Sequence, residues 1–307
     1  ILLFLFPSLF SFSQSLFSKY HDLHPNDYDF GWEVAPTDYG IFAVGNYRCE
    51  EGVNDLCAQL ILFDYEGEIL WNKKFSDFKV QFECLYYDEE NEHLYISGHT
   101  SDFSNDTLND FLHLYKCDIN GDSIWHHSYE IPLVPPGYFA ICTGLTMQDD
   151  KIILYGGGNK GTTYQDIFGN ILWIDQDGSL DTIVYTNQGQ DLAQSLYGGQ
   201  VDADGNFVVM YERTNIVPGQ AGVPRDVPGF LKYNANKELI WIYDYALINI
   251  DPIFPVFTTN PNNDITMAIS RYEHYTMPDL GIIIRRISET QDSIWEYAFP
   301  DFPTGRV

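Results

Sequence analysis

The chain has 307 residues, of which 45% are hydrophobic and 16% aromatic, so it can bury a sizeable core and is not a disordered protein. Its formal charge of −28, from 44 acidic and 16 basic residues, excludes nucleic acid and anionic membrane surfaces as partners, because both are bound through clustered Lys and Arg. Aromatic residues suit the pleated surface of a sheet, so the composition favours an all-β fold.

The first residues form an almost wholly apolar segment, residues 1–12, interrupted by Pro7. A small-x-small pattern follows at residues 11–13, as before a signal-peptidase site, so residues 1–13 are predicted to be an N-terminally truncated signal peptide. Cleavage after Ser13 leaves residues 14–26 as a leader segment. The alternative is a buried apolar strand. No later apolar run has the length of a membrane span, and we expect a secreted or cell-surface protein.

The five cysteines fall into two groups. Cys49 and Cys57 share a polar segment between two strand-like runs and are the candidate disulfide of an oxidising compartment. Cys84, Cys117 and Cys142 lie within strand-like runs, where we expect small buried hydrophobes. Because no CxxC occurs, a zinc ribbon and thiol redox chemistry have no support.

From residue 27 onward one pattern recurs five times. A unit of about 55 residues contains three strand-like runs, then a tight turn, then a fourth run that carries Trp. The predicted units are residues 27–80, 81–135, 136–191, 192–250 and 251–307. Each unit is expected to form one four-stranded antiparallel sheet.

The tight turns follow an Asp-x-x-Gly pattern that has a physical basis. Gly67, Gly121 and Gly178 stand at the last turn position, where a left-handed backbone costs glycine little, and the Asp that opens each turn can accept bonds from the backbone that follows. Lys237 and Gln291 occupy the glycine position in the last two units. We expect those two hairpins to be less ideal.

The recurrent tryptophans are Trp71, Trp125, Trp241 and Trp295, and Thr182 takes that place in the third unit. One four-stranded sheet buries neither face alone, whereas sheets stacked face to face around an axis bury both. We therefore predict an all-β propeller with about five blades visible, either complete or part of a larger propeller, and Trp packing between blades. A β-solenoid and a two-sheet sandwich are the alternatives, which the repeat length fits less well.

The run D-x-x-G-x-x-x-W at residues 64–71 and 118–125 resembles the tryptophan-docking repeat of quinoprotein-like propellers. The larger unit is similar to repeats of secreted bacterial proteins exported by the type IX system. The resemblance covers roughly residues 27–299 and implies a propeller fold and export rather than an activity. Quinoprotein dehydrogenases typically carry an adjacent pair of cysteines. This sequence has none, which argues against that activity.

Candidate metal ligands are limited to two turns with alternating carboxylates, Asp175 with Asp177 and Asp202 with Asp204. Neither continues into a complete calcium-binding loop, so turn chemistry is the preferred interpretation, and we expect no cofactor, with calcium as the alternative. The sequence has no HExxH, GxSxG or Walker spacing. Its carboxylates are too numerous for a glycosidase pair to be chosen.

These observations favour an exported, non-catalytic scaffold that binds a protein or a glycan, and a chain that is more a binding protein than an enzyme. The predicted binding surface comprises the variable segments 48–56, 100–109, 159–168 and 214–228. One alternative is a polysaccharide-acting hydrolase or lyase with carboxylates in the axial channel. Another is a purely structural module of a longer surface protein. Convergent channel carboxylates with shifted pKa values would favour the enzyme.

Overall fold

The computed structural model describes residues 29–48, 56–75, 80–100, 111–134, 140–159, 167–186, 193–215, 225–244, 251–272 and 282–299. The predicted signal peptide and leader, and most of the variable segments, lie outside these residues. The described residues form strands and turns, and they include no helix that could cross a membrane.

The strands make five antiparallel sheets, or blades, each from four consecutive strands. Blade 1 comprises β1 (Asp29–Thr37), β2 (Gly40–Arg48), β3 (Leu56–Phe63) and β4 (Ile69–Phe75). Blade 2 comprises β5 (Val80–Asp88), β6 (His93–Thr100), β7 (Phe111–Asp118) and β8 (Ser123–Glu130). Blade 3 comprises β9 (Ala140–Gln148), β10 (Lys151–Asn159), β11 (Ile167–Ile174) and β12 (Leu180–Tyr185). Blade 4 comprises β13 (Ala193–Val201), β14 (Phe207–Asn215), β15 (Arg225–Tyr233) and β16 (Leu239–Asp244). Blade 5 comprises β17 (Asp251–Thr259), β18 (Ile265–Tyr272), β19 (Ile282–Ile287) and β20 (Ser293–Phe299).

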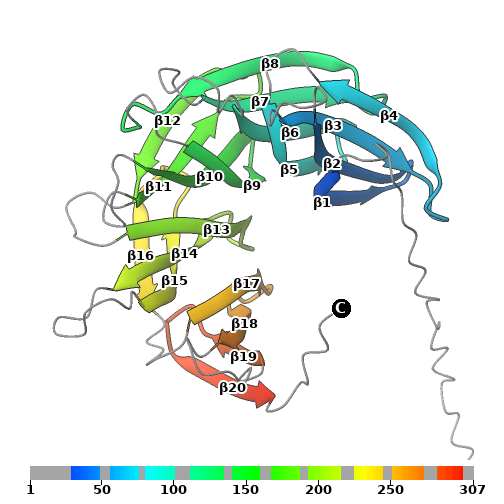
Figure 1. Cartoon of the computed structure of the whole chain (residues 1–307). Coiled ribbons are helices and arrows are strands. Elements are labelled where there is room, and N and C mark those ends of the chain that lie inside the picture. Colours follow the sequence, from blue (N-terminus) through cyan, green and yellow to red (C-terminus); the bar gives the residue numbers. More distant parts are fainter. Residues whose placement is uncertain are drawn as a thin grey trace, which may run out of the picture.

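The blades follow one another around a common axis, with the first strand of each blade innermost (Figure 1). Contacts between consecutive inner strands join β1 to β5, β5 to β9, β9 to β13 and β13 to β17. The predicted propeller of four-stranded blades is confirmed.

Four apolar clusters fill the seams between consecutive blades. Leu60 belongs to the cluster between blades 1 and 2, and Leu154 to the one between blades 2 and 3. Trp173 of β11 lies between blades 3 and 4, and Phe230 between blades 4 and 5. Within the described parts of the chain no such cluster joins blade 5 to blade 1, and these two blades stand apart in Figure 1. The described blades therefore form an open arc.

The recurrent tryptophans lie on the face that each blade turns toward the next. Trp71, Trp125 and Trp241 are half-buried and pack on the clusters of the seams that follow their blades. Trp295 of blade 5, at the end of the arc, is 42% exposed. A Cβ placed on Gly121 would lie only 2.9 Å from the Trp71 ring. The tryptophan of blade 1 therefore contacts the hairpin turn of blade 2.

The outer hairpins share one turn geometry whether or not glycine is present. Gly67, Gly121 and Gly178 have φ values of 82°, 73° and 86°, while Lys237 and Gln291 have 67° and 69°. In every case the amide of this residue donates to the carbonyl three residues earlier. A residue with a side chain in the left-handed region costs about 1 kcal/mol or more. The hairpin turns of the last two blades carry this conformational cost, and those with glycine do not.

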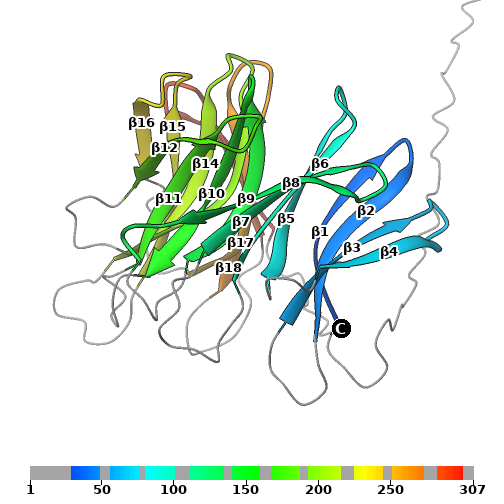
Figure 2. The same cartoon turned by 90° about the horizontal axis from the view of Figure 1, so that it is seen from above.

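The antiparallel strand directions define two ends of the arc. The tight turns between first and second strands, and between third and fourth strands, gather at one end, here the hairpin end (Figure 2). The second strands end and the third strands begin at the opposite end, here the loop end. Each variable segment stands between a second and a third strand in chain order, and most of it lies outside the described residues.

Candidate active site in the axial cavity

The innermost strand of each blade carries an irregularity in its pairing with the second strand. The shifts lie at 31–33 in β1, 82–84 in β5, 142–144 in β9, 197–199 in β13 and 253–256 in β17. A bulge leaves an extra residue unpaired and re-aims the neighbouring side chains, and bulges are common beside active sites. Here five bulged strands surround the axis.

A cavity of about 790 Å³ lies among these bulges. Its wall combines two glutamates, several aromatic rings and exposed backbone from blades 1, 3, 4 and 5: Trp32, Glu33, Thr143, Gly144, Leu145, Tyr155, Tyr197, Gly198, Gly199, Gln200, Glu212, Val256 and Phe257. A concave site with an apolar wall and a few polar groups is typical of small-molecule and substrate sites.

Glu33 is the carboxylate that blade 1 presents to this cavity. Its Oε2 accepts a hydrogen bond of 2.6 Å from the backbone amide of Leu85 on β5, which fixes the side chain at the seam between blades 1 and 2. The side chain is open to the cavity, yet the surrounding blades crowd the carboxylate. This desolvation raises the pKa of Glu33, and the Leu85 hydrogen bond offsets only part of the shift. A carboxyl group with a raised pKa keeps its proton to higher pH than an ordinary glutamate and can therefore act as a proton donor.

Two further glutamates lie near the axis, in different environments. Glu212 of β14 lines the cavity together with Glu33 and is half-buried. Glu83 is the extra residue of the β5 bulge, and its Oε2 lies 3.1 Å from Nδ1 of His99. Glu83 is not among the residues that line the cavity, so Glu212 is the second carboxyl group of its described wall.

The wall of the cavity in blades 3 and 4 is tightly packed. Oγ1 of Thr143, the extra residue of the β9 bulge, donates a 2.6 Å hydrogen bond to the carbonyl of Leu196 on β13. A Cβ on Gly144 would lie 2.0 Å from the Tyr155 ring, so glycine leaves the space that this ring fills. Burial raises the pKa of Tyr155 well above its usual value, which keeps the phenol neutral.

Comparison with known proteins gives a fold but no sequence relative. No protein-family model and no curated protein matches the chain. Among solved structures, the GH93 α-L-arabinofuranosidase of Fusarium graminearum with arabinobiose aligns with a TM-score of 0.53 at 12% identity, over 90% of this chain and 82% of that chain. The α-L-arabinanase of Penicillium chrysogenum with arabinobiose gives 0.51 at 9% identity, over 86% and 89%. The polysaccharide lyase Uly1 gives 0.50 at 12%, over 89% and 73%. The likeness is one of fold. The chain shares its β-propeller architecture with these three proteins.

These matches overturn two sequence-based expectations. The chain was expected to be a non-catalytic scaffold and more a binding protein than an enzyme, but the similar folds belong to glycoside hydrolases and a lyase. Both expectations are therefore wrong. Sequence patterns alone favoured them because the repeat describes blade packing, which is the same whether or not the axis holds catalytic groups.

The carboxylates proposed as weak calcium ligands lie at the hairpin end, away from the cavity. Oγ of Ser179 donates to Asp177 at 2.7 Å, and Lys151 forms an ion pair with Asp175. The Ser179 contact is that of a turn-forming Asp residue, whereas Lys151 reaches Asp175 from the start of β10. Among the described residues, no three His, Cys, Asp or Glu side chains lie close enough together to hold a metal ion.

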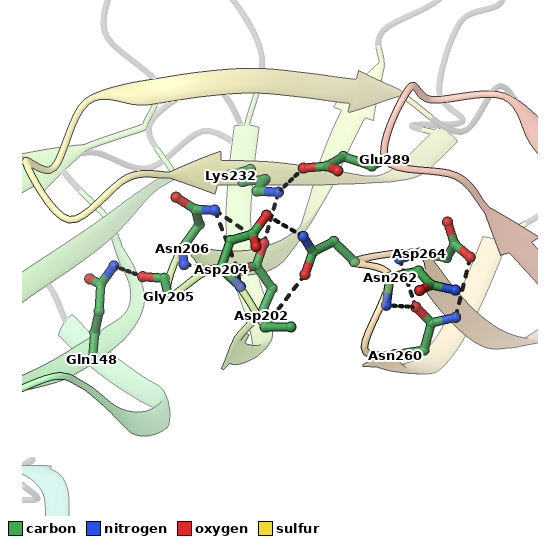
Figure 3. Close-up of polar contacts among 12 residues, drawn as sticks. Gln148, Asp202, Asp204, Gly205, Asn206, Lys232, Asn260, Asn262, Asp264 and Glu289 are labelled. Atoms are coloured by element: carbon green, nitrogen blue, oxygen red, sulfur yellow. Dashed lines mark hydrogen bonds and ion pairs between the residues drawn. The ribbon is translucent and has the colours of Figure 1, made fainter.

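Asp202 and Asp204, in the turn between β13 and β14, form part of a polar cluster between blades 4 and 5 (Figure 3). Lys232 of β15 lies between Asp202 at 2.8 Å and Glu289 of the β19–β20 turn at 2.9 Å. Nδ2 of Asn263, from blade 5, donates to Asp204 at 2.5 Å. These side chains join two blades by polar contacts.

Of the two cysteines proposed to form a disulfide, Cys57 of β3 is disulfide-bonded. Cys49 lies outside the described residues. Cys84, Cys117 and Cys142 are buried and carry free thiols.

Sequence reasoning did not single out Glu33 or Glu212 among 44 acidic residues. One signal was available for Glu33. The first residue after each bulge that pairs again with the second strand is Glu33 in β1, Cys84 in β5 and Gly144 in β9. Blade 1 therefore has a carboxylate where the other two blades have a small residue. Aligning inner strands by their bulges, rather than by their turns, would have exposed it.

Proposed function

We propose that the chain is an exported polysaccharide-acting hydrolase whose active site is the axial cavity. The observation that carries this proposal is the pair of glutamates in the cavity wall, one of which, Glu33, has its pKa raised by desolvation. Hydrolysis of a glycosidic bond needs two carboxyl groups flanking the bond, one of them protonated. The fold shared with an α-L-arabinofuranosidase and an α-L-arabinanase supports the same assignment.

Each glutamate has a distinct role in this proposal. Glu33 donates its proton to the glycosidic oxygen as the bond breaks, because its environment favours the protonated form. Glu212 acts as base or nucleophile on the other side of the glycosidic bond. Since Glu33 works as an acid, activity falls as pH rises through its pKa. This chemistry requires no cofactor.

The substrate expected here is a neutral polysaccharide. Trp32 is 55% exposed beside Glu33, and Phe257 lies across the cavity wall, so aromatic faces are available to stack against sugar rings. A chain with a formal charge of −28 repels polyanionic glycans. Polysaccharide lyases act beside a uronate carboxylate, so the charge favours hydrolysis of uncharged sugars.

The test is an activity screen with arabinan, other neutral polysaccharides and uronate polymers, in which new reducing ends and unsaturated products are measured. We expect reducing ends from a neutral polymer. Glu33→Gln and Glu212→Gln should each lower kcat/KM by about 10²–10⁴-fold, and Glu33→Gln should remove the high-pH decline. Glu66→Gln, on an exposed turn at the hairpin end, is the matched control. Wild-type activity in both cavity variants, or no product from any polymer, refutes the proposal.

We further propose that the tryptophan-bearing hairpins are of the tryptophan-docking type and that export follows the type IX route. The contact between Trp71 and the Gly121 turn supports the first. The second rests on the resemblance of the repeats and is tested by secretion of the full-length gene product from a type IX host and from a secretion-deficient strain.

A further inference from the structure

Two buried thiols face each other across the seam between blades 2 and 3. Sγ of Cys84, on the inner strand β5, lies 3.1 Å from Sγ of Cys142, on the inner strand β9. Each residue is only 2% exposed. Sulfur atoms in a disulfide are ~2.05 Å apart, so a movement of about 1 Å separates this arrangement from a bond.

The surroundings hold the two thiols in this position. Cys142 also contacts Oγ of Ser97 at 2.9 Å, and the carbonyl of Gly144 lies 3.5 Å from its sulfur. Burial is the main cause of a pKa of Cys84 well above the usual value. A neutral buried thiol reacts slowly, so any oxidation has to occur while the seam is still forming.

We propose that Cys84 and Cys142 form a disulfide that covalently joins blades 2 and 3 when the protein folds in an oxidising compartment. The disulfide at Cys57 supports such a compartment, because a chain that forms one structural disulfide encounters the oxidant that forms a second. The two sulfurs come from residues 58 positions apart, so this bond links elements that the backbone leaves independent.

The reaction uses a small-molecule disulfide such as oxidised glutathione as the oxidant. The Cys84 thiolate attacks one glutathione sulfur, forms a mixed disulfide and releases a glutathione thiolate. The Cys142 thiolate then attacks the Cys84 sulfur and releases the second glutathione. The two protons from the protein thiols go to the two glutathione thiolates, and the two electrons reduce the glutathione disulfide.

This bond would join the β5 bulge to the β9 bulge, whose Thr143 lines the cavity. Cys84 stands between Glu83, the extra residue of the β5 bulge, and Leu85, whose amide donates to Glu33. Cys142 directly precedes Thr143, the extra residue of the β9 bulge. The disulfide therefore holds the backbone that positions Glu33, whatever reaction the cavity performs.

The test refolds the chain in a glutathione redox buffer, denatures it without reductant, and labels free thiols with iodoacetamide before peptide mass spectrometry. Cys117 is the internal control, since it is equally buried but lies in the cluster between blades 1 and 2. Labelling of Cys84 and Cys142 should be at least about tenfold below that of Cys117, because only a thiol can be alkylated. A linked peptide pair lacking two hydrogen atoms should also appear.

The Cys84→Ser variant provides the second arm. It should restore labelling of Cys142, and it serves as the reduced reference. If the folded wild-type chain labels Cys84 and Cys142 as fully as Cys117, or if either cysteine is found linked to another residue, the proposal is overturned. Because the readout is mass and not activity, failure of the hydrolase assignment does not affect it.

Discussion

Replacing Lys232 with Met is the most direct test of the polar seam between blades 4 and 5. The Lys232 side chain is 2% exposed and that of Asp202 is 1% exposed, while Glu289 is about half exposed. Burial alone would lower the pKa of Lys232, but the hydrogen bonds with Asp202 and Glu289 together raise it. This raised value means that the ion pairs stabilise the fold below pH about 10.4 and lose that contribution as pH rises through the folded-state pKa.

The magnitude follows from the charge left behind. At an effective dielectric constant near 20, charges 2.8 Å apart attract by about 6 kcal/mol, most of which offsets the cost of desolvating both groups. Removing one partner of a buried pair costs about 3–5 kcal/mol. Asp202 still accepts hydrogen bonds from the amides of Asp204 at 3.0 Å and Asn206 at 2.8 Å, so we expect the lower end, about 3 kcal/mol. For a chain of 307 residues that lowers Tm by about 5 °C.

Thermal and urea unfolding of Lys232→Met measure the loss. Lys73→Met is the matched control, because Lys73 pairs with Asp122 across blades 1 and 2 with side chains 34% and 73% exposed, and such exposed pairs contribute less than about 1 kcal/mol. Adding Asp202→Asn should recover most of the stability by removing the uncompensated charge. If Lys232→Met costs no more than Lys73→Met, the reasoning is wrong.

Three further outcomes are expected. Gly121→Ala and Gly205→Ala both place a side chain at positive φ, but only Gly121 faces a neighbouring ring, that of Trp71. In urea unfolding, Gly121→Ala should therefore lower the free energy of unfolding by about 1 kcal/mol or more beyond the loss in Gly205→Ala. Equal losses would disprove docking. Trp71→Ala should destabilise by about 2–3 kcal/mol, and Trp295→Ala, at the exposed end of the arc, by less than about 1 kcal/mol, as calorimetry can show. The pH–rate profile of kcat/KM should decline on its alkaline side at a pH above the usual Glu pKa, and a decline near pH about 4.3 would exclude Glu33 as the acid.

The blade architecture was predictable because it depends on contacts between residues that are close together in the sequence. Asp64 opens a turn whose side chain binds the amides of Glu66 and Glu68, and Asp118 repeats this in blade 2. Such contacts span no more than a few residues, so sequence spacing reveals them. Stacking of the sheets then follows from their apolar faces, which have no other place to be buried.

The candidate site was not predictable in the same way. Glu33 depends on a bulge in its own strand and on the amide of Leu85 in the next blade, and it shares the cavity wall with Glu212 from blade 4. None of these relations is a spacing in the sequence. The approach of Cys84 to Cys142 is likewise decided where two blades meet.

The amino-acid sequence by itself therefore determined the repeated blade, its turns and its strand order, since these arise from residues close together in the chain. Only the tertiary structure decided which carboxyl groups share the axial cavity, which of them is desolvated and which thiols face each other. The desolvation of a carboxyl group and the proximity of two thiols depend on side chains from separate blades, which come together only when the blades pack against one another.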